Sequence, residues 1–167
     1  MSIKTITAVA LLMSANYALA TDSPINGTVQ PKCSVYTETQ GVYGNPLPNK
    51  LDTLPASGGT KASIRYDVAQ ANFYLARITH PDSFSSSPTL DDAVAWVGSS
   101  VVGQVSVAAM SDYEAAKVIS PVNVTTFDLT LAGSTWFTVS STATYGYNKA
   151  LPAGNYTAII KADCIAK

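Results

Sequence analysis

The segment that most constrains the fold is residues 151–165, close to the C-terminal end of the sequence. Its side chains of one parity are apolar or small: Tyr156, Ala158, Ile160, Ala162 and Cys164. The intervening residues are mostly polar, and Pro152 and Gly154 form a turn signal ahead of them. Side chains on a β-strand alternate between its two faces, so this spacing predicts a strand with one buried face.

The N-terminal end has the features of a secretory signal. Lys4 supplies positive charge, residues 6–13 are mostly apolar, and residues 18–20 form a small-x-small cleavage site. The apolar run is too short for a membrane-spanning helix. We therefore predict that residues 1–20 are a signal peptide and that residues 21–167 form a single exported domain.

The chain contains two cysteines, Cys33 and Cys164, and one histidine. In an exported chain, two cysteines most simply form one disulfide. Cys33 lies on the apolar side of a second alternating segment, residues 21–35, which glycine and proline interrupt. A Cys33–Cys164 disulfide would staple the first predicted strand to the last. The sequence has no CxxC or HxxxH spacing, so we expect no structural zinc site.

The composition argues against two classes of partner. Charged residues make up 13% of the chain, and the formal net charge is −1. Neutralising many phosphates requires clustered Lys and Arg, and no basic cluster is visible, so we expect no nucleic-acid partner. After the signal sequence no run approaches the ~18 apolar residues of a spanning helix, so we expect no transmembrane segment in the mature chain.

Short alternating segments separated by turn residues continue along most of the sequence. The clearest is residues 61–68, and residues 72–79 follow closely enough to pair with it as a hairpin. The other predicted strands are residues 94–97, 103–109, 122–131 and 135–144, and the one helical turn is residues 112–118. This pattern favours an all-β sandwich of seven to nine strands, with a closed barrel as the alternative.

The sequence Leu151-Pro152-Ala153-Gly154-Asn155-Tyr156-Thr157 resembles the turn and final strand of bacterial chaperone–usher pilin-type subunits. Spore-coat-U-like secreted pilins look most similar, followed by alpha-type fimbrial pilins. The resemblance implies an immunoglobulin-like β-sandwich that lacks its last strand. In such subunits a periplasmic chaperone supplies the missing strand first, and the N-terminal extension of the next subunit replaces it.

The resemblance also implies roles for particular residues. The donor strand would come from residues 21–29, with Ile25 and Val29 inserted. The acceptor groove would be lined by the alternating residues of the last strand: Tyr156, Ala158, Ile160 and Ala162. The protein would pass through the periplasm, with a chaperone and an outer-membrane usher as partners. It would then join like subunits in a surface fibre, or fimbria, that serves adhesion or biofilm formation.

The position of Cys164 supports a different interpretation. A disulfide between the first and last strands is compatible with a self-complete sandwich, which would be a secreted binding domain for carbohydrate or a surface protein. Trp96 and Trp136, together with tyrosines, could then form a sugar-stacking face. The tyrosines expected to be exposed are Tyr36, Tyr43, Tyr145 and Tyr147.

No arrangement of residues indicates catalysis. His80 lies beside Pro81 and Asp82, where we expect a surface turn, and no GxSxG nucleophile motif is present. Asp82, Asp91 and Asp92 lack the spacing of a calcium-binding loop. We therefore expect no enzymatic activity, no cofactor and no metal site.

Overall fold

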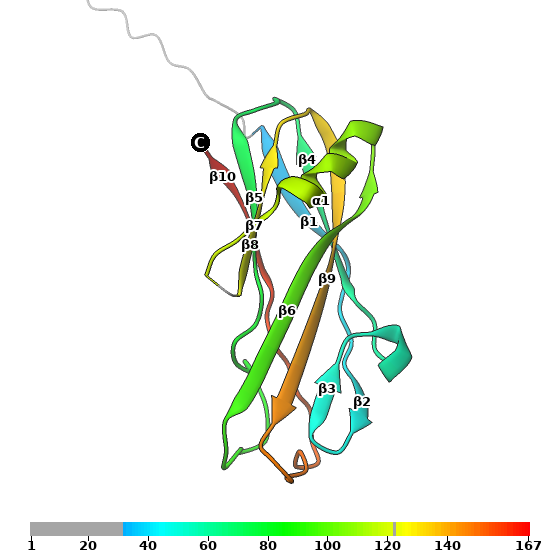
Figure 1. Ribbon diagram of the computed structural model, residues 1–167, viewed down its shortest axis with the longest axis vertical. Helices are drawn as coiled ribbons and strands as arrows, with labels where there is room; N and C mark the ends of the chain where they lie inside the picture. Colours follow the sequence, from blue (N-terminus) through cyan, green and yellow to red (C-terminus); the bar gives the residue numbers. More distant parts are fainter. Residues whose placement is uncertain (1–31, 122) are drawn as a thin grey trace, which may run out of the picture. The chain divides into compact units, whose positions relative to one another are not determined.

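The computed structural model describes residues 32–121 and 123–167, which form a sandwich of two antiparallel β-sheets (Figure 1). Residues 31–167 belong to one compact unit. The predicted signal peptide and the candidate donor residues Ile25 and Val29 lie outside the described residues. Within the described ranges, no helix is both long enough and apolar enough to span a bilayer.

The larger sheet is organised around one long strand, β9. Its six strands are β1 (Cys33–Thr39), β2 (Gly44–Leu47), β3 (Lys50–Asp52), β4 (Ala62–Val68), β6 (Val94–Val105) and β9 (Gly133–Tyr145). β6 and β9 lie side by side (Figure 1), and their pairing runs from Val94 and Tyr145 to Val105 and Thr135. The opposite side of β9 is shared by β4 and β3, which pair in turn with β1 and β2.

The smaller sheet has four strands in the order β10-β5-β8-β7. They are β5 (Tyr74–Thr79), β7 (Val118–Ile119), β8 (Val124–Leu129) and β10 (Lys161–Ala166). Three short helical segments lie in the connections: η1 (Pro55–Ser57), η2 (Ala108–Asp112) and α1 (Tyr113–Ala116). The last two overlap the helical turn predicted for residues 112–118.

Alternation of side chains produces the core between the sheets. In β9 every second residue is buried: Thr135, Phe137, Val139, Ser141, Ala143 and Tyr145. Phe137 contacts Tyr66 edge to face, with ring centroids 5.4 Å apart, and lies 4.2 Å from Phe127 of the other sheet. The β9 residues that alternate with the buried ones are only half-buried and are mainly Ser and Thr. Such residues suit a pleated surface that meets water.

The predicted disulfide between the first and last strands is present. Cys33 of β1 and Cys164 of β10 form a disulfide with their Cα atoms 6.1 Å apart. Because β1 and β10 belong to different sheets, the disulfide joins the two layers at one side of the sandwich. A disulfide is compatible with an exported protein.

Several local predictions are wrong in ways that have physical reasons. Residues 61–68 and 72–79 form strands but no hairpin, because β4 and β5 lie in different sheets. The two strands predicted at 94–97 and 103–109 are one strand, β6, whose pairing with β9 slips by one residue at Gly103. The described residues contain ten strands, more than the predicted seven to nine, because the Pro- and Asn-containing residues 44–52 form the small β2–β3 hairpin and residues 118–119 form the two-residue strand β7.

Candidate functional site

The candidate site is the free edge of β10. Within the described ranges β5 is the only strand that pairs with β10. The Lys167 N–H donates to the Phe73 carbonyl at 3.0 Å, so Lys167 and Phe73 form a hydrogen-bonded pair. Along an antiparallel ladder, hydrogen-bonded pairs alternate with non-hydrogen-bonded pairs. The register therefore directs the backbone polar groups of Ala162, Cys164 and Ala166 away from β5. This edge can accept another strand.

The chain ahead of β10 continues the same one-sided pairing. The Thr157 N–H donates to the Ser86 carbonyl at 2.8 Å, and the Ser85 N–H donates to the Thr157 carbonyl at 2.8 Å. Residues 85 and 86 follow β5 in the chain, so they extend the ladder on the side that β5 already occupies. The opposite side of residues 157–166 has no strand within the described part of the chain.

The side chains of this segment follow the predicted alternation. The inward-facing residues are all half-buried: Tyr156, Ala158, Ile160, Ala162 and Cys164. The residues between them are exposed, including Ile159 at 57%. The corresponding residues of β9 are fully buried, whereas Ile160, Ala162 and Cys164 pack against the core and still reach solvent. The apolar face of β10 is therefore incompletely covered by the described residues.

The larger sheet also has a free edge on this side. The Ala69 N–H donates to the Lys32 carbonyl at 2.7 Å, so the alternation directs the backbone groups of Cys33, Val35 and Thr37 away from β4. Val35 is half-buried against the core. The disulfide thus holds together two free edges, one from each sheet. A strand laid along β10 would satisfy its backbone groups and cover the half-buried side chains.

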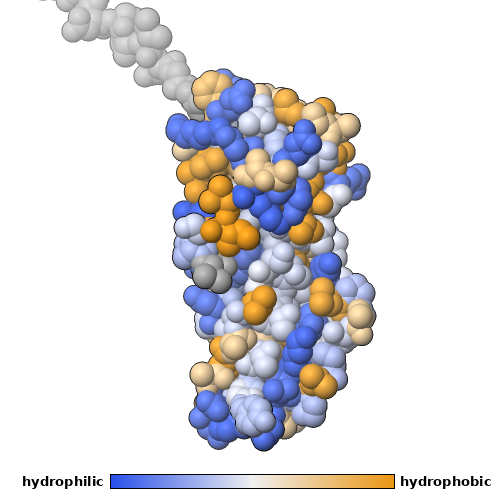
Figure 2. All heavy atoms as spheres, viewed as in Figure 1, coloured by the Kyte–Doolittle hydropathy of each residue, from blue (hydrophilic) through white to orange (hydrophobic). Residues whose placement is uncertain are grey.

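The other long edge of the sandwich is obstructed. Glu114, in α1, accepts a hydrogen bond from the Val102 N–H at 2.8 Å, and Lys117 donates to the Ser100 carbonyl at 3.0 Å. These side chains occupy backbone groups on the outer edge of β6, as natural edge strands often require. Figure 2 shows hydrophobic residues near β7, where Val118 and Ile119 are exposed, but β7 is only two residues long.

The two faces of β10 differ in polarity. On its outer face Arg77 and Asp163 form an ion pair at 3.0 Å, and Lys161 is exposed. The inner face carries the half-buried Ala162 and Cys164. A strand that suits this edge would alternate apolar residues on its inner side with polar residues on its outer side.

His80 is buried, contrary to the predicted surface turn. Its side chain is 2% exposed, and Nε2 lies 3.2 Å from Thr125 Oγ1 and 3.3 Å from Ser100 Oγ. Burial lowers the pKa of the imidazole below its ordinary value. Ser100 is itself only 1% exposed, so this contact joins the sheets rather than presenting a nucleophile to solvent. Thr125 is 45 residues from His80 in the sequence, so no local pattern indicated this contact.

The predicted exposed tyrosines do not form one face. Tyr36 and Tyr147 are exposed, at 46% and 90%, and Tyr43 is half-buried. Tyr145 is buried, contrary to the prediction, and its hydroxyl donates to Asp91. Trp136 lies on the outside of β9. There the Arg65 guanidinium carbon is 5.8 Å from the centroid of the indole ring.

The candidate calcium ligands are not gathered into a site. Lys149 Nζ lies 3.1 Å from an oxygen of Asp91 and 3.5 Å from an oxygen of Asp92. The carboxylates of Asp91 and Asp92 therefore lie beside the Lys149 ammonium group, and they do not converge with Asp82. In the part of the chain that the structure describes, no group of three or more acidic, His or Cys residues is placed to hold a metal ion.

Comparison with protein-family models finds no family that matches this chain, and comparison with curated proteins finds no match.

Proposed function

We propose that this protein is a structural subunit of an exported surface fibre, a fimbria- or pilus-like assembly with a role in adhesion or biofilm formation. The observation that carries the proposal is the edge of β10, whose outward backbone groups have no strand beside them within residues 32–121 and 123–167 and whose apolar face is half-buried. The resemblance of residues 151–157 to pilin-type subunits supports it. A periplasmic chaperone and an outer-membrane usher are the proposed partners in transit.

The proposed occupant of the edge is residues 21–30 of a second copy of the chain. Ile25 and Val29 are four positions apart, so an extended chain places both on one face, as the apolar side of β10 requires. Asn26 and Thr28 would face outward beside the polar residues of β10. Strand addition of this kind combines backbone hydrogen bonds with alternating side-chain contacts.

The disulfide limits how a strand from the same chain could reach the edge of β10. It places Cys33, at the start of β1, beside Cys164, near the end of β10. A segment that leads into Cys33 would have to reverse its direction to run along β10 of the same chain. A strand from a neighbouring copy needs no such reversal.

Assembly of the purified mature chain, residues 21–167, tests this proposal. We expect light scattering to show oligomers or fibres, whereas a chain that lacks residues 21–30 stays a folded monomer. The double variant Ile25→Asp/Val29→Asp should also fail to assemble, because two charges would enter the apolar face. The control Asn26→Asp/Thr28→Asp adds the same charges to the opposite face and should still assemble.

Two results would contradict the proposal. The first is a mature chain that remains a soluble, stable monomer at high concentration. The second is loss of assembly in both double variants to the same degree, since net charge rather than strand insertion would then control association.

A further inference from the structure

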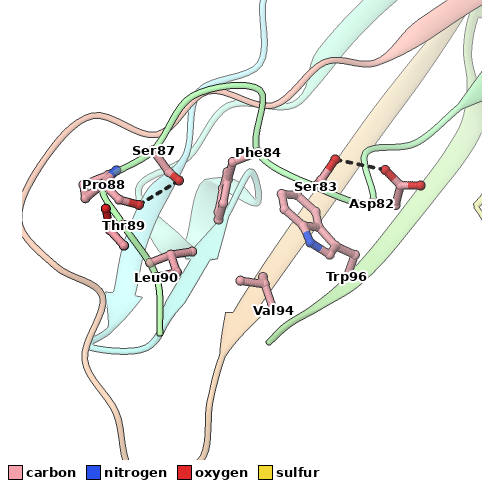
Figure 3. A pocket seen from close by; sticks show the side chains of 9 residues that line it. All are labelled: Asp82, Ser83, Phe84, Ser87, Pro88, Thr89, Leu90, Val94 and Trp96. Carbon is pink, nitrogen blue, oxygen red and sulfur yellow. Dashed lines mark hydrogen bonds between the residues drawn. The ribbon is translucent and has the colours of Figure 1, made fainter. Parts of the chain in front are cut away.

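Two hollows adjoin each other beside β6, on the side away from β9. The first measures about 480 Å³ and lies between residues 82–90 and the first half of β6 (Figure 3). The second measures about 440 Å³ and is lined by Gly98, Asn123 and neighbouring residues. Asp82 and Trp96 line both hollows. Each volume lies within the range of small-molecule sites.

The apolar wall is an aromatic cluster that holds the Trp96 indole in place. Phe84 contacts Trp96 at 4.7 Å and Tyr156 at 5.0 Å between ring centroids. Figure 3 shows Phe84 and Trp96 approaching the hollow from the loop and from β6, with Leu90 and Val94 at its apolar side. Trp96 is half-buried, so part of the indole remains available to a ligand.

Polar groups line the hollows beside this wall. They include the Trp96 indole N–H and the Asn123 side-chain amide. The Asp82 carboxylate is exposed and accepts one hydrogen bond, from Ser83 Oγ at 3.2 Å. The Val102 N–H points away from β9, and every second residue of β6 has its backbone groups on the same side. The backbone groups of Trp96, six residues earlier, therefore also point away from β9.

Buried contacts hold the parts of this region together. His80, two residues before Asp82, lies so close to β6 that a Cβ on Gly98 would stand 2.3 Å from His80 Cγ. The His80 N–H also donates to the Asn123 carbonyl at 2.7 Å. The segment after β5 that carries Asp82, the residue Asn123 ahead of β8, and β6 with Trp96 are therefore fixed relative to one another, and a rigid frame is what precise recognition needs.

We infer that these two hollows form a binding site for a neutral oligosaccharide, with Trp96 as the stacking surface and Asp82 and Asn123 as hydrogen-bonding groups. A sugar ring offers an apolar face to an indole and hydroxyl groups to a carboxylate and an amide. Asp82 is the only charged residue among the described residues that line the hollows, which disfavours anionic ligands. The two hollows on either side of Trp96 suit two or more linked sugar rings.

The site lies beside the proposed assembly edge and touches it where Tyr156 packs against Phe84. The residues that line the hollows belong to β6, to residues 81–90 and to residues 121 and 123, not to β10. Should subunits polymerise, each would present one copy, and weak single-site binding would be reinforced by multivalency.

Ligand binding can be measured on the mature chain with Trp136→Phe, which leaves Trp96 as its only tryptophan. The probes are neutral di- and trisaccharides of glucose, galactose, mannose and N-acetylglucosamine, with a sulfated disaccharide and choline as charged counterparts. We expect at least one neutral sugar to shift the Trp96 indole N–H resonance and fluorescence. Neither charged probe should do so at the same concentration.

Two variants locate the site. Asp82→Asn is an exposed, isosteric change, and we expect it to weaken sugar binding by about tenfold or more, since it replaces a charge-assisted hydrogen bond. Trp96→Ala should abolish the binding, and circular dichroism checks its folding. Asp163→Asn, an exposed carboxylate on β10, is the matched control and should bind normally.

Three outcomes would overturn the inference. These are no response to any neutral sugar at millimolar concentration, tighter binding of choline or the sulfated sugar, and unchanged affinity in Asp82→Asn. Variants that block assembly at residues 25 and 29 should keep the sugar affinity, so failure of one proposal is distinguishable from failure of the other.

Discussion

At the scale of single residues, His80 shows how a buried polar contact joins the sandwich. Its ring lies between the sheets, with Nε2 near the hydroxyls of Ser100 and Thr125. Nδ1 is buried and has no partner within the described residues. The ring fits because Gly98 has no side chain. Protonation would place a positive charge in this enclosed space, and burial accordingly lowers the pKa of the imidazole.

The expected consequence is a loss of stability in mild acid. Because the folded-state pKa lies below the ordinary value of 6.5, the unfolded chain binds more protons, and stability rises with pH in this window. The contribution is complete above pH 6.5 and falls as the pH drops through the folded-state pKa. The slope for one proton is at most about 1.4 kcal/mol per pH unit.

Urea unfolding between pH 8 and pH 5 measures this slope, and His80→Gln is the comparison because it keeps a polar side chain but does not titrate there. We expect the variant to be less stable at pH 8 and to lose less stability than the wild type on acidification. Since the chain has one histidine, its titration is a single resonance in an NMR experiment. Parallel pH profiles would show that His80 is not responsible.

At the scale of elements, β9 and β10 illustrate two outcomes of the same alternation. Both show period-2 patterns, but β9 has neighbours on both sides and buries its inward residues fully. In the part of the chain that the structure describes, β10 has one neighbour, and its inward residues are half-buried. The number of neighbouring strands, not the pattern itself, therefore sets how completely a face is covered.

A pair of adjacent substitutions in β9 tests the energetic difference between its faces. Phe137→Ala removes a fully buried ring from between Tyr66 and Phe127 and should lower the free energy of unfolding by about 3–5 kcal/mol. Thr138→Ala, one position along and on the outer face, should change it by about 0.5 kcal/mol or less. Chemical denaturation measures both values. Similar losses in the two variants would contradict the assigned orientation of β9.

At the scale of the whole molecule, the disulfide connects the ends of the described fold. It links residues 131 positions apart and joins the free edges of the two sheets. Cross-linking so long a loop reduces the entropy of the unfolded chain, and the chain-entropy model gives a maximum of about 4–5 kcal/mol. The disulfide also keeps the two edges together without a strand between them.

Replacing both cysteines should destabilise the protein strongly. We expect Cys33→Ser/Cys164→Ser to lower the free energy of unfolding by about 2–5 kcal/mol, as measured in urea under oxidising conditions. Reductant should bring the wild type close to the variant and leave the variant unchanged. Equal stabilities of the oxidised wild type and the variant would show that the disulfide contributes no net stabilisation.

Much of the local structure can be predicted from residues that are near one another in the sequence. The inward side chains of residues 61–68, 135–144 and 156–164 follow from period-2 alternation, because the face of a strand is a local property. Two cysteines in a chain with the sequence features of a secretory signal were also enough to predict the Cys33–Cys164 pair.

Pairing between distant segments could be decided only by the tertiary structure. Whether residues 61–68 and 72–79 form a hairpin, whether His80 is buried, and which edge α1 obstructs all depend on contacts far apart in sequence. The same applies to the meeting of Asp82, Trp96 and Asn123. Alternation shows which side of a strand faces inward, but hydrogen bonds to neighbours run within the sheet plane and leave no local periodic signal. The sequence alone therefore determined that residues 156–164 have an apolar face, and the fold of the described residues decided that this face lies at an open edge.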